Sequence, residues 1–197
     1  MPAKGRLTFI VGGARSGKSG YAERLAVQEQ KPVLYVATGQ DLDDEMQKRI
    51  AMHRERRAAD WQTLELPAQV GRHLQAGLTN AGVVILDCLT LLVSNVLLQA
   101  AGDVDHPDEA GATAAVDVEV TELLHAMDAI PAHWLVVSNE VGQGLVPPYP
   151  TGRLFRDVLG WANQRLADKA DEVFWMVAGI PVPIGEYRTR STTKNTK

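Results

Sequence analysis

The sequence contains a single cysteine, Cys88, among 197 residues. One thiol can form neither an internal disulfide nor a zinc site built from several cysteines, so a secreted disulfide framework is excluded. The apolar run at residues 7–11 is too short for the core of a signal peptide, and no small-residue cleavage site follows it. We therefore expect a cytoplasmic protein.

Basic residues are not in excess. Lys and Arg total 20 and Asp and Glu total 24, which gives a formal net charge of -4 at pH 7. A general nucleic-acid-binding protein neutralises the phosphates of the nucleic acid with a surplus of basic side chains. We therefore expect no nucleic-acid partner.

Long uninterrupted apolar runs are also lacking. Residues 83–101 come closest to the length of a membrane span, but Asp87, Ser94, Asn95 and Gln99 interrupt them. Because a charge inside a span is costly, a buried strand followed by a helix accounts for the same residues better. We expect no membrane span.

Short β-branched and aromatic runs alternate with longer segments of helical pattern. The runs are almost continuously apolar, which is typical of parallel strands covered by helices on both faces and predicts an α/β fold. The expected strands are residues 7–11, 32–37, 83–86, 134–137 and 173–177, with an edge strand at 61–66. The expected helices are residues 18–30, 43–57, 68–78, 89–100, 114–130 and 153–170.

The segments between these elements have the composition of loops. Residues 102–111 are an acidic connection, and residues 146–152 hold three prolines, which predicts an extended loop. The polar residues after 184 are typical of a loose tail. The chain length suits one domain with a substantial core, which we place at residues 1–184 with a tail at 185–197.

A complete phosphate-loop pattern, G-x-x-x-x-G-K-S, follows the first strand. Its glycines let backbone amides point inward at a phosphate, and the next helix presents its positive end. Lys18 is placed to reach the β- and γ-phosphates and Ser19 to hold magnesium. The alternative is a glycine-rich turn that matches by chance, but the expected strand before it and helix after it favour a single-domain P-loop fold of the RecA-like class. The loop residues are Gly12, Gly13, Ala14, Arg15, Ser16, Gly17, Lys18 and Ser19.

Asp87 ends the buried run at residues 83–86. An acid at the end of another buried strand is the usual second partner of magnesium in phosphate-loop enzymes. The alternative is a carboxylate that only caps the helix starting near Leu89. The two roles are compatible.

The phosphate loop does not by itself define the reaction, because kinases, motor ATPases and switch GTPases share it. The sequence has no Asn-Lys-x-Asp motif for reading guanine, and the chain is compact for a motor with a separate partner-binding domain. A small-molecule transferase is therefore the leading class.

His53 falls on the inward face of the helix expected at residues 43–57, between Leu42 and Met46 on the helical wheel. Guanidinium groups near an imidazole suit a bound triphosphate or pyrophosphate, and they favour the neutral imidazole that a nucleophile at phosphorus requires. The alternatives are a half-buried structural histidine and a solvated basic face. The arginines around His53 are Arg49, Arg54, Arg56 and Arg57.

Three blocks of sequence occur in a specific order. The first is the phosphate loop, and the second comprises residues 37–38, 43–46, 49–50, 53–54 and 61–65. The third is Ser138-Asn139-Glu140-Val141-Gly142-Gln143-Gly144-Leu145-Val146-Pro147, then Arg153, Phe155-Arg156-Asp157, Gly160, Asn163-Gln164-Arg165-Leu166-Ala167, Ala170-Asp171 and Gly179-Ile180-Pro181. From Gly12 to about residue 184, the chain resembles the bifunctional adenosylcobinamide kinase / adenosylcobinamide-phosphate guanylyltransferase family of cobalamin biosynthesis.

The resemblance implies two reactions. ATP or GTP phosphorylates adenosylcobinamide, and His53 then accepts the guanylyl group of GTP and passes it to adenosylcobinamide phosphate, giving adenosylcobinamide-GDP and pyrophosphate. Lys18 and Ser19 would serve both reactions, with Mg²⁺ on Ser19 and Asp87. The resemblance further implies a guanine-nucleotide site lined by Ala37, Thr38, Gly39, Arg54, Glu55, Arg56, Arg57, Glu65 and Asp87.

The resemblance also implies a homotrimer, with the large corrinoid held in a cleft shared between subunits. Relatives carry either Asp or Glu at the position of Asp87, and they end soon after residue 184. The general base of the kinase step stays open among Asp43, Asp44 and Glu140. Two alternatives also remain: a simple P-loop small-molecule kinase without a histidine intermediate, and a GTP-binding regulatory module without group transfer.

Overall fold

A seven-stranded sheet in the order β3-β2-β4-β5-β1-β6-β7 forms the centre of the molecule. The computed structural model describes residues 5–40, 58, 60–77 and 80–187. Within them β1 to β6 run parallel, and only β7 runs antiparallel, against β6. The strands are β1 (Arg6–Gly12), β2 (Val33–Ala37), β3 (Gln62–Glu65), β4 (Val83–Asp87), β5 (His133–Asn139), β6 (Glu172–Val177) and β7 (Ile180–Pro183).

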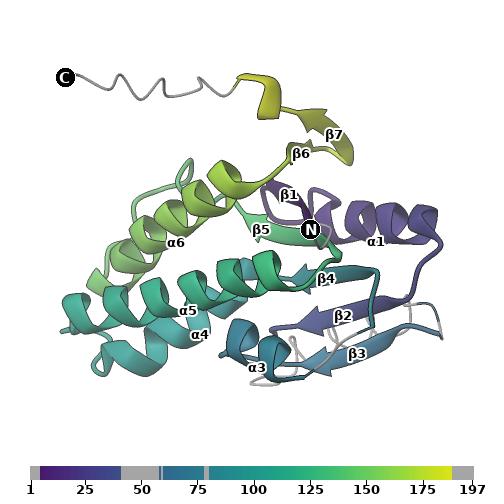
Figure 1. Ribbon diagram of the computed structural model, residues 1–197. Coiled ribbons are helices and arrows are strands. Elements are labelled where there is room, and N and C mark those ends of the chain that lie inside the picture. The colour runs from purple at the N-terminus through teal and green to yellow at the C-terminus, as the bar shows by residue number, and fades with distance from the viewer. Residues whose placement is uncertain (1–4, 41–57, 59, 78–79, 188–197) are drawn as a thin grey trace, which may run out of the picture.

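Side chains that alternate along the strands build two cores. Phe9 packs into the larger core and the next residue, Ile10, into the smaller one. The larger core lies under α3 (Val70–Ala76), α4 (Leu89–Ala101), α5 (Glu109–Ala129) and α6 (Pro150–Lys169), and the smaller one under α1 (Lys18–Glu29). Figure 1 shows α1 on the opposite side of the sheet from these four helices. This two-sided burial explains why the strands are almost continuously apolar.

The predicted α/β fold, a mostly parallel central sheet with helices on both faces, is confirmed. Strand β5 separates β1, which enters the phosphate loop, from β4, which ends in Asp87. The carboxyl ends of parallel strands meet at one edge, where open α/β sheets bind ligands. This edge therefore holds the predicted site residues that the structure describes.

Two helices begin earlier than predicted. Helix α5 starts at Glu109, inside the segment expected to be a loop, because the Asp108 side chain accepts a 3.0 Å hydrogen bond from the Gly111 amide and caps the helix. Helix α6 starts at Pro150, inside the expected proline-rich loop. Proline suits the first helical position, where its missing N–H has no partner to lose.

Strand β7 was not predicted. Its four residues include Pro181 and Pro183, which weaken a strand signal, and it lies at the sheet edge, where proline is tolerated. A short 3-10 helix, Gly185–Tyr187, follows Ile184. The helix expected at residues 43–57 lies outside the described residues.

In the described part of the chain, no helix combines the length and apolar character needed to cross a membrane. The apolar segment at residues 83–101 divides into β4 and α4, as expected.

Candidate nucleotide-binding site

The phosphate loop joins β1 to α1. Gly17 has a φ of 94°, a left-handed conformation that favours glycine, and it directly precedes the helix. A Cβ atom at Gly12 would lie 2.6 Å from the Met176 carbonyl oxygen, so β6 can pack this closely only because residue 12 is glycine. The Gly179 amide also donates a 3.0 Å hydrogen bond to the Ser16 carbonyl. The β6–β7 connection therefore braces the loop, which faces the amino-terminal end of α1.

Lys18 is buried, with 7% of its surface exposed. Its Nζ donates a 2.7 Å hydrogen bond to the Gly13 carbonyl, so the ammonium group lies within the loop. Burial lowers the pKa of Lys18, and the neighbouring Cys88 and Asp87 oppose that shift. The site thus places a cation where phosphate oxygens would gather, with a carboxylate in its electrostatic range.

Asp87 occupies the carboxyl end of β4 and is half-buried. Its Oδ2 accepts a 2.5 Å hydrogen bond from the Tyr35 hydroxyl, and the Tyr35 ring stacks on Trp61 with a centroid distance of 6.4 Å. The N-cap residue of α4 is Cys88, which makes no side-chain cap hydrogen bond.

The predicted nucleotide-site residues of three adjacent strands form one row. Glu65 of β3 aligns with Ala37 of β2, and Ala37 aligns with Asp87 of β4. Aligned residues of parallel strands share a face, and Ala37 packs against the core under α1. The structure therefore brings Ala37, Glu65 and Asp87 to the same edge and face as the phosphate loop.

Asn95 of α4 fixes the loops that follow β2 and β3, a role that the sequence reasoning missed. Its Nδ2 donates to the Thr38 carbonyl at 2.8 Å and to the Pro67 carbonyl at 2.9 Å. Thr38 is fully buried, and its hydroxyl bonds both backbone groups of Cys88, donating to the carbonyl at 2.7 Å and accepting from the amide at 2.8 Å. Thr38 is therefore tied to the end of β4 and to α4.

A buried polar network supports the end of β5. The Ser138 hydroxyl donates to Asn163 Oδ1 at 2.7 Å, and Asn163 Nδ2 donates to the Asn139 carbonyl at 3.0 Å. The Asn139 amide donates to the Thr90 hydroxyl at 2.7 Å. The sequence resemblance included Asn139 and Asn163 but not Thr90, whose contact spans 49 positions.

The catalytic histidine predicted from the resemblance is not placed by the structure. His53 and its neighbours Arg54, Glu55, Arg56 and Arg57 lie outside the described residues. Across residues 5–40, 58, 60–77 and 80–187, no group of three or more His, Cys, Asp or Glu side chains is arranged to hold a metal. Ser19 and Asp87 supply a hydroxyl and a carboxylate, the hard oxygen donors that Mg²⁺ prefers when phosphates and water complete its shell.

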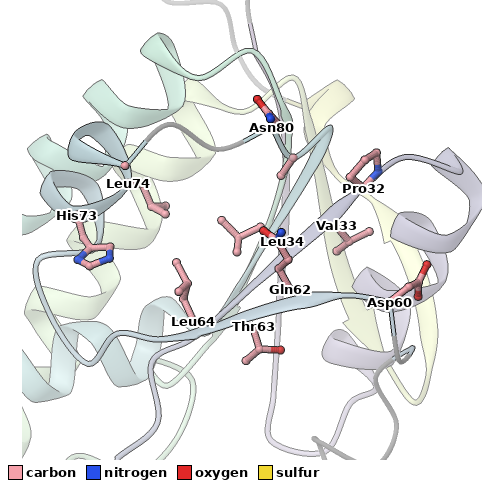
Figure 2. A pocket seen from close by; sticks show the side chains of 12 residues that line it. Pro32, Val33, Leu34, Asp60, Gln62, Thr63, Leu64, His73, Leu74 and Asn80 are labelled. Atoms are coloured by element: carbon pink, nitrogen blue, oxygen red, sulfur yellow. The ribbon is translucent and has the colours of Figure 1, made fainter.

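A cavity of about 570 Å³ lies elsewhere, beside the amino-terminal ends of β2 and β3. Figure 2 shows Leu34, Leu64 and Leu74 projecting into it from β2, β3 and α3. The phosphate loop follows the carboxyl end of β1, so this cavity is not the phosphate site.

Comparison with known proteins gives one family and several relatives. The family described as "CobU: Cobinamide kinase / cobinamide phosphate guanyltransferase" matches residues 8–184. The "Bifunctional adenosylcobalamin biosynthesis protein CobU" of Escherichia coli (strain K12) is 42% identical over 181 residues, covering 90% of this chain and 99% of that protein. The protein of the same name from Salmonella typhimurium is 42% identical over 180 residues, again covering 90% and 99%. Among solved structures, the RadB recombinase aligns with a TM-score of 0.49 and 17% identity, covering 88% of this chain and 74% of that one.

Proposed function

Because the chain belongs to the cobinamide kinase / cobinamide phosphate guanyltransferase family, we propose that one phosphate loop serves both reactions of a bifunctional transferase of cobalamin biosynthesis. The first reaction moves the γ-phosphate of ATP or GTP to a hydroxyl group of adenosylcobinamide. The second moves GMP from GTP to adenosylcobinamide phosphate and gives adenosylcobinamide-GDP and pyrophosphate. The observation that carries this proposal is the complete phosphate loop, with the Lys18 ammonium inside it and Asp87 in electrostatic range.

Lys18 would bind the β- and γ-phosphates of the nucleotide. In the structure its Nζ bonds the Gly13 carbonyl, and phosphate oxygens would replace that acceptor. Charge moves onto the leaving phosphates in both reactions, so a fixed cation stabilises the transition state more than the ground state. The amides at the start of α1 act in the same direction.

Ser19 and Asp87 would hold Mg²⁺. Their oxygen atoms fit that ion, and the Tyr35 hydroxyl holds one oxygen of Asp87 in a defined direction. When bound, the ion would neutralise the β- and γ-phosphate oxygens.

His53 would be the acceptor of the guanylyl group, an assignment that rests on the sequence resemblance. An imidazole nitrogen attacks the α-phosphorus of GTP, a P–N bond forms, the bond to the β-phosphate oxygen breaks, and pyrophosphate leaves. A phosphate oxygen of adenosylcobinamide phosphate then attacks the same phosphorus and the P–N bond breaks. Two displacements replace one direct encounter between two anions. Arg54, Arg56 and Arg57 would stabilise the departing pyrophosphate.

The guanine-nucleotide site would include the row formed by Glu65, Ala37 and Asp87, together with Thr38, Gly39 and Glu55. The alignment of the row on one face of β3, β2 and β4 supports this assignment. Asn95 would keep the loops after β2 and β3 in position through its two carbonyl contacts.

The chain would assemble as a homotrimer in the cytoplasm. Trp175 aligns with Val182, and Val177 with Ile180, so these four apolar side chains share one face of the β6–β7 hairpin. Their exposure is 38%, 38%, 42% and 64%, respectively, which supports burial of this face in self-association. The buried free thiol of Cys88 supports a reducing compartment.

Chromatography of the corrinoid products tests the two activities. The protein is incubated with adenosylcobinamide, Mg²⁺ and ATP, and GTP is added in a second stage. We expect adenosylcobinamide phosphate in the first stage and adenosylcobinamide-GDP in the second. If adenosylcobinamide phosphate forms but is not converted to adenosylcobinamide-GDP, the result would indicate a simple kinase. If the protein binds GTP but forms no corrinoid product, the result would favour a regulatory module.

A further inference from the structure

Glu140 directly follows β5, the strand between the phosphate-loop strand β1 and the Asp87 strand β4. Its amide donates a 3.1 Å hydrogen bond to the Gly12 carbonyl, so its backbone is fixed against the first residue of the phosphate loop. Adjacent strands lie about 4.8 Å apart. In the strand order, Glu140 is one strand from the loop, Asp87 two and Glu65 four. Of these three carboxylates, Glu140 is therefore the nearest to the phosphate loop along the sheet.

The carboxylate of Glu140 is also held in a defined direction. Its Oε1 accepts a 2.6 Å hydrogen bond from the Gly142 amide. Arg156 of α6 donates to the Gly142 carbonyl at 2.7 Å and so holds the same turn. Within the described part of the chain, no donor is in hydrogen-bond contact with Oε2, which leaves this oxygen able to accept a proton.

The backbone that precedes Glu140 is rigid as well. Asn139 is bonded through its amide to Thr90 and through its carbonyl to Asn163, at 2.7 and 3.0 Å. A general base must be positioned before the reaction, because misplacement by about 1 Å costs much of its effect. The polar network beneath β5 provides that positioning.

We propose that Glu140 is the general base of the kinase step, an inference that rests on the proposed function. The hydroxyl oxygen of adenosylcobinamide attacks the γ-phosphorus of ATP while its proton passes to the Glu140 carboxylate. A P–O bond to the acceptor forms, the bond between the γ-phosphorus and the β,γ-bridging oxygen breaks, and ADP leaves. No proton has to be taken from a hydroxyl in the guanylyl transfer, whose attacking group is already a phosphate oxygen.

The other carboxylates at this edge fit the role less well. Asp87 is engaged by Tyr35 and is the proposed magnesium ligand. Glu65 is four strands from the phosphate loop, about 19 Å at the usual strand spacing. Asp43 and Asp44, the other two candidates from the sequence, lie outside the described residues.

The Glu140→Gln variant tests this assignment. Glutamine retains an oxygen that can accept from the Gly142 amide, so the turn is kept while the base is lost. We expect kcat of the kinase reaction to fall about 10²- to 10⁴-fold with KM for ATP unchanged. Guanylyl transfer from GTP to preformed adenosylcobinamide phosphate should keep its wild-type rate. Asp168→Asn, the same chemical change at an exposed residue of α6, is the matched control and should leave both rates unchanged.

The outcomes are distinct. Kinase turnover at the wild-type rate in Glu140→Gln would overturn the proposal, because another group would then take the proton. Parallel loss of both reactions would also overturn it and would indicate that Glu140 only maintains the loop. A wild-type chain that transfers guanylyl groups but does not phosphorylate adenosylcobinamide would contradict the kinase half of the proposed function itself.

Discussion

The Tyr35 hydroxyl, from the middle of β2, donates a 2.5 Å hydrogen bond to Oδ2 of Asp87 at the end of β4, 52 positions away in the sequence. One strand thereby orients the acid that the neighbouring strand presents at the nucleotide-binding edge. Partners of this kind commonly tune how a ligand residue binds its metal.

Replacing Tyr35 with phenylalanine removes this hydrogen bond and keeps the aromatic ring that stacks on Trp61. We expect the Mg²⁺ concentration that gives half-maximal activity to rise about 10- to 100-fold, because Asp87 loses its orienting partner. Titration of both reactions with Mg²⁺ measures the effect. Tyr21→Phe on α1 makes the same change outside the metal site and serves as the control. An unchanged Mg²⁺ requirement in Tyr35→Phe would show that Asp87 is not a metal ligand, or that its hydrogen bond with Tyr35 does not affect metal binding.

Replacing Lys18 with methionine removes the charge and keeps most of the side-chain volume. Both reactions should slow by at least about 10²- to 10³-fold, because one fixed donor to the developing phosphate charge is lost. Folding should not suffer, since a buried ammonium group is costly and burial already lowers the pKa of Lys18.

Steady-state rates and thermal melting of this variant are compared with those of Lys31→Met. Lys31 is half exposed and pairs with Glu29 at 2.6 Å, so its loss should change neither rate. A Lys18→Met protein that retains one of the two reactions would show that the phosphate loop serves only the other.

Glu119 holds the start of α3. Its carboxylate is buried and accepts hydrogen bonds from the amides of Gln69 and Val70 at 2.7 and 2.9 Å. Glu119→Ala should lower the free energy of unfolding by about 1–3 kcal/mol, because these donors lose their partner. Glu122→Ala, one turn further along α5, removes an exposed pair with Arg72 and should cost less than about 1 kcal/mol. Urea unfolding of both variants is the measurement, and equal losses would contradict the capping role.

His133 makes stability depend on pH. It is buried near the amino-terminal end of the sheet, 3.0 Å from Glu29 and 2.8 Å from Thr8. Burial lowers the pKa of His133 from 6.5, against the opposing hydrogen bond of Glu29, while Arg6 adds to the shift and Glu172 opposes it. As the pH falls below 6.5, the unfolded chain binds a proton that the folded chain does not yet accept, so the free energy of unfolding decreases.

The unfolding midpoint in urea, measured at about pH 7.5 and about pH 5.5, should therefore decrease toward the lower pH. His133→Gln cannot titrate in this range and should lose less stability between the two pH values than the wild type does. His125→Gln, at an exposed histidine, should behave as the wild type. A pH dependence that is the same in all three proteins would contradict a contribution from His133.

The local features of the site could be predicted from the sequence. The phosphate loop is a continuous motif, and Asp87 ends a short apolar run, so the positions of both relative to strands could be predicted without knowing the fold. The short β-branched and aromatic runs predicted six of the strands. Each of these signals lies within a few consecutive residues.

Contacts between distant residues could not be predicted in this way. Tyr35 is a buried strand residue like its neighbours, and only the register of β2 against β4 brings it to Asp87. Asn95 read as an interruption of an apolar segment, whereas it joins two loops at the site. Strand β7 was missed because its prolines weaken the local pattern, and pairing with β6 outweighs that weakness.

The central claim is that one phosphate loop serves a transfer that passes through His53. Intact-mass analysis after incubation with GTP and Mg²⁺, with His53→Ala alongside, tests it most directly. The account predicts that the wild type gains the mass of one guanylyl group, that adenosylcobinamide phosphate removes it, and that His53→Ala gains none. A wild type that binds GTP without any adduct, or an adduct that persists in His53→Ala, would contradict it.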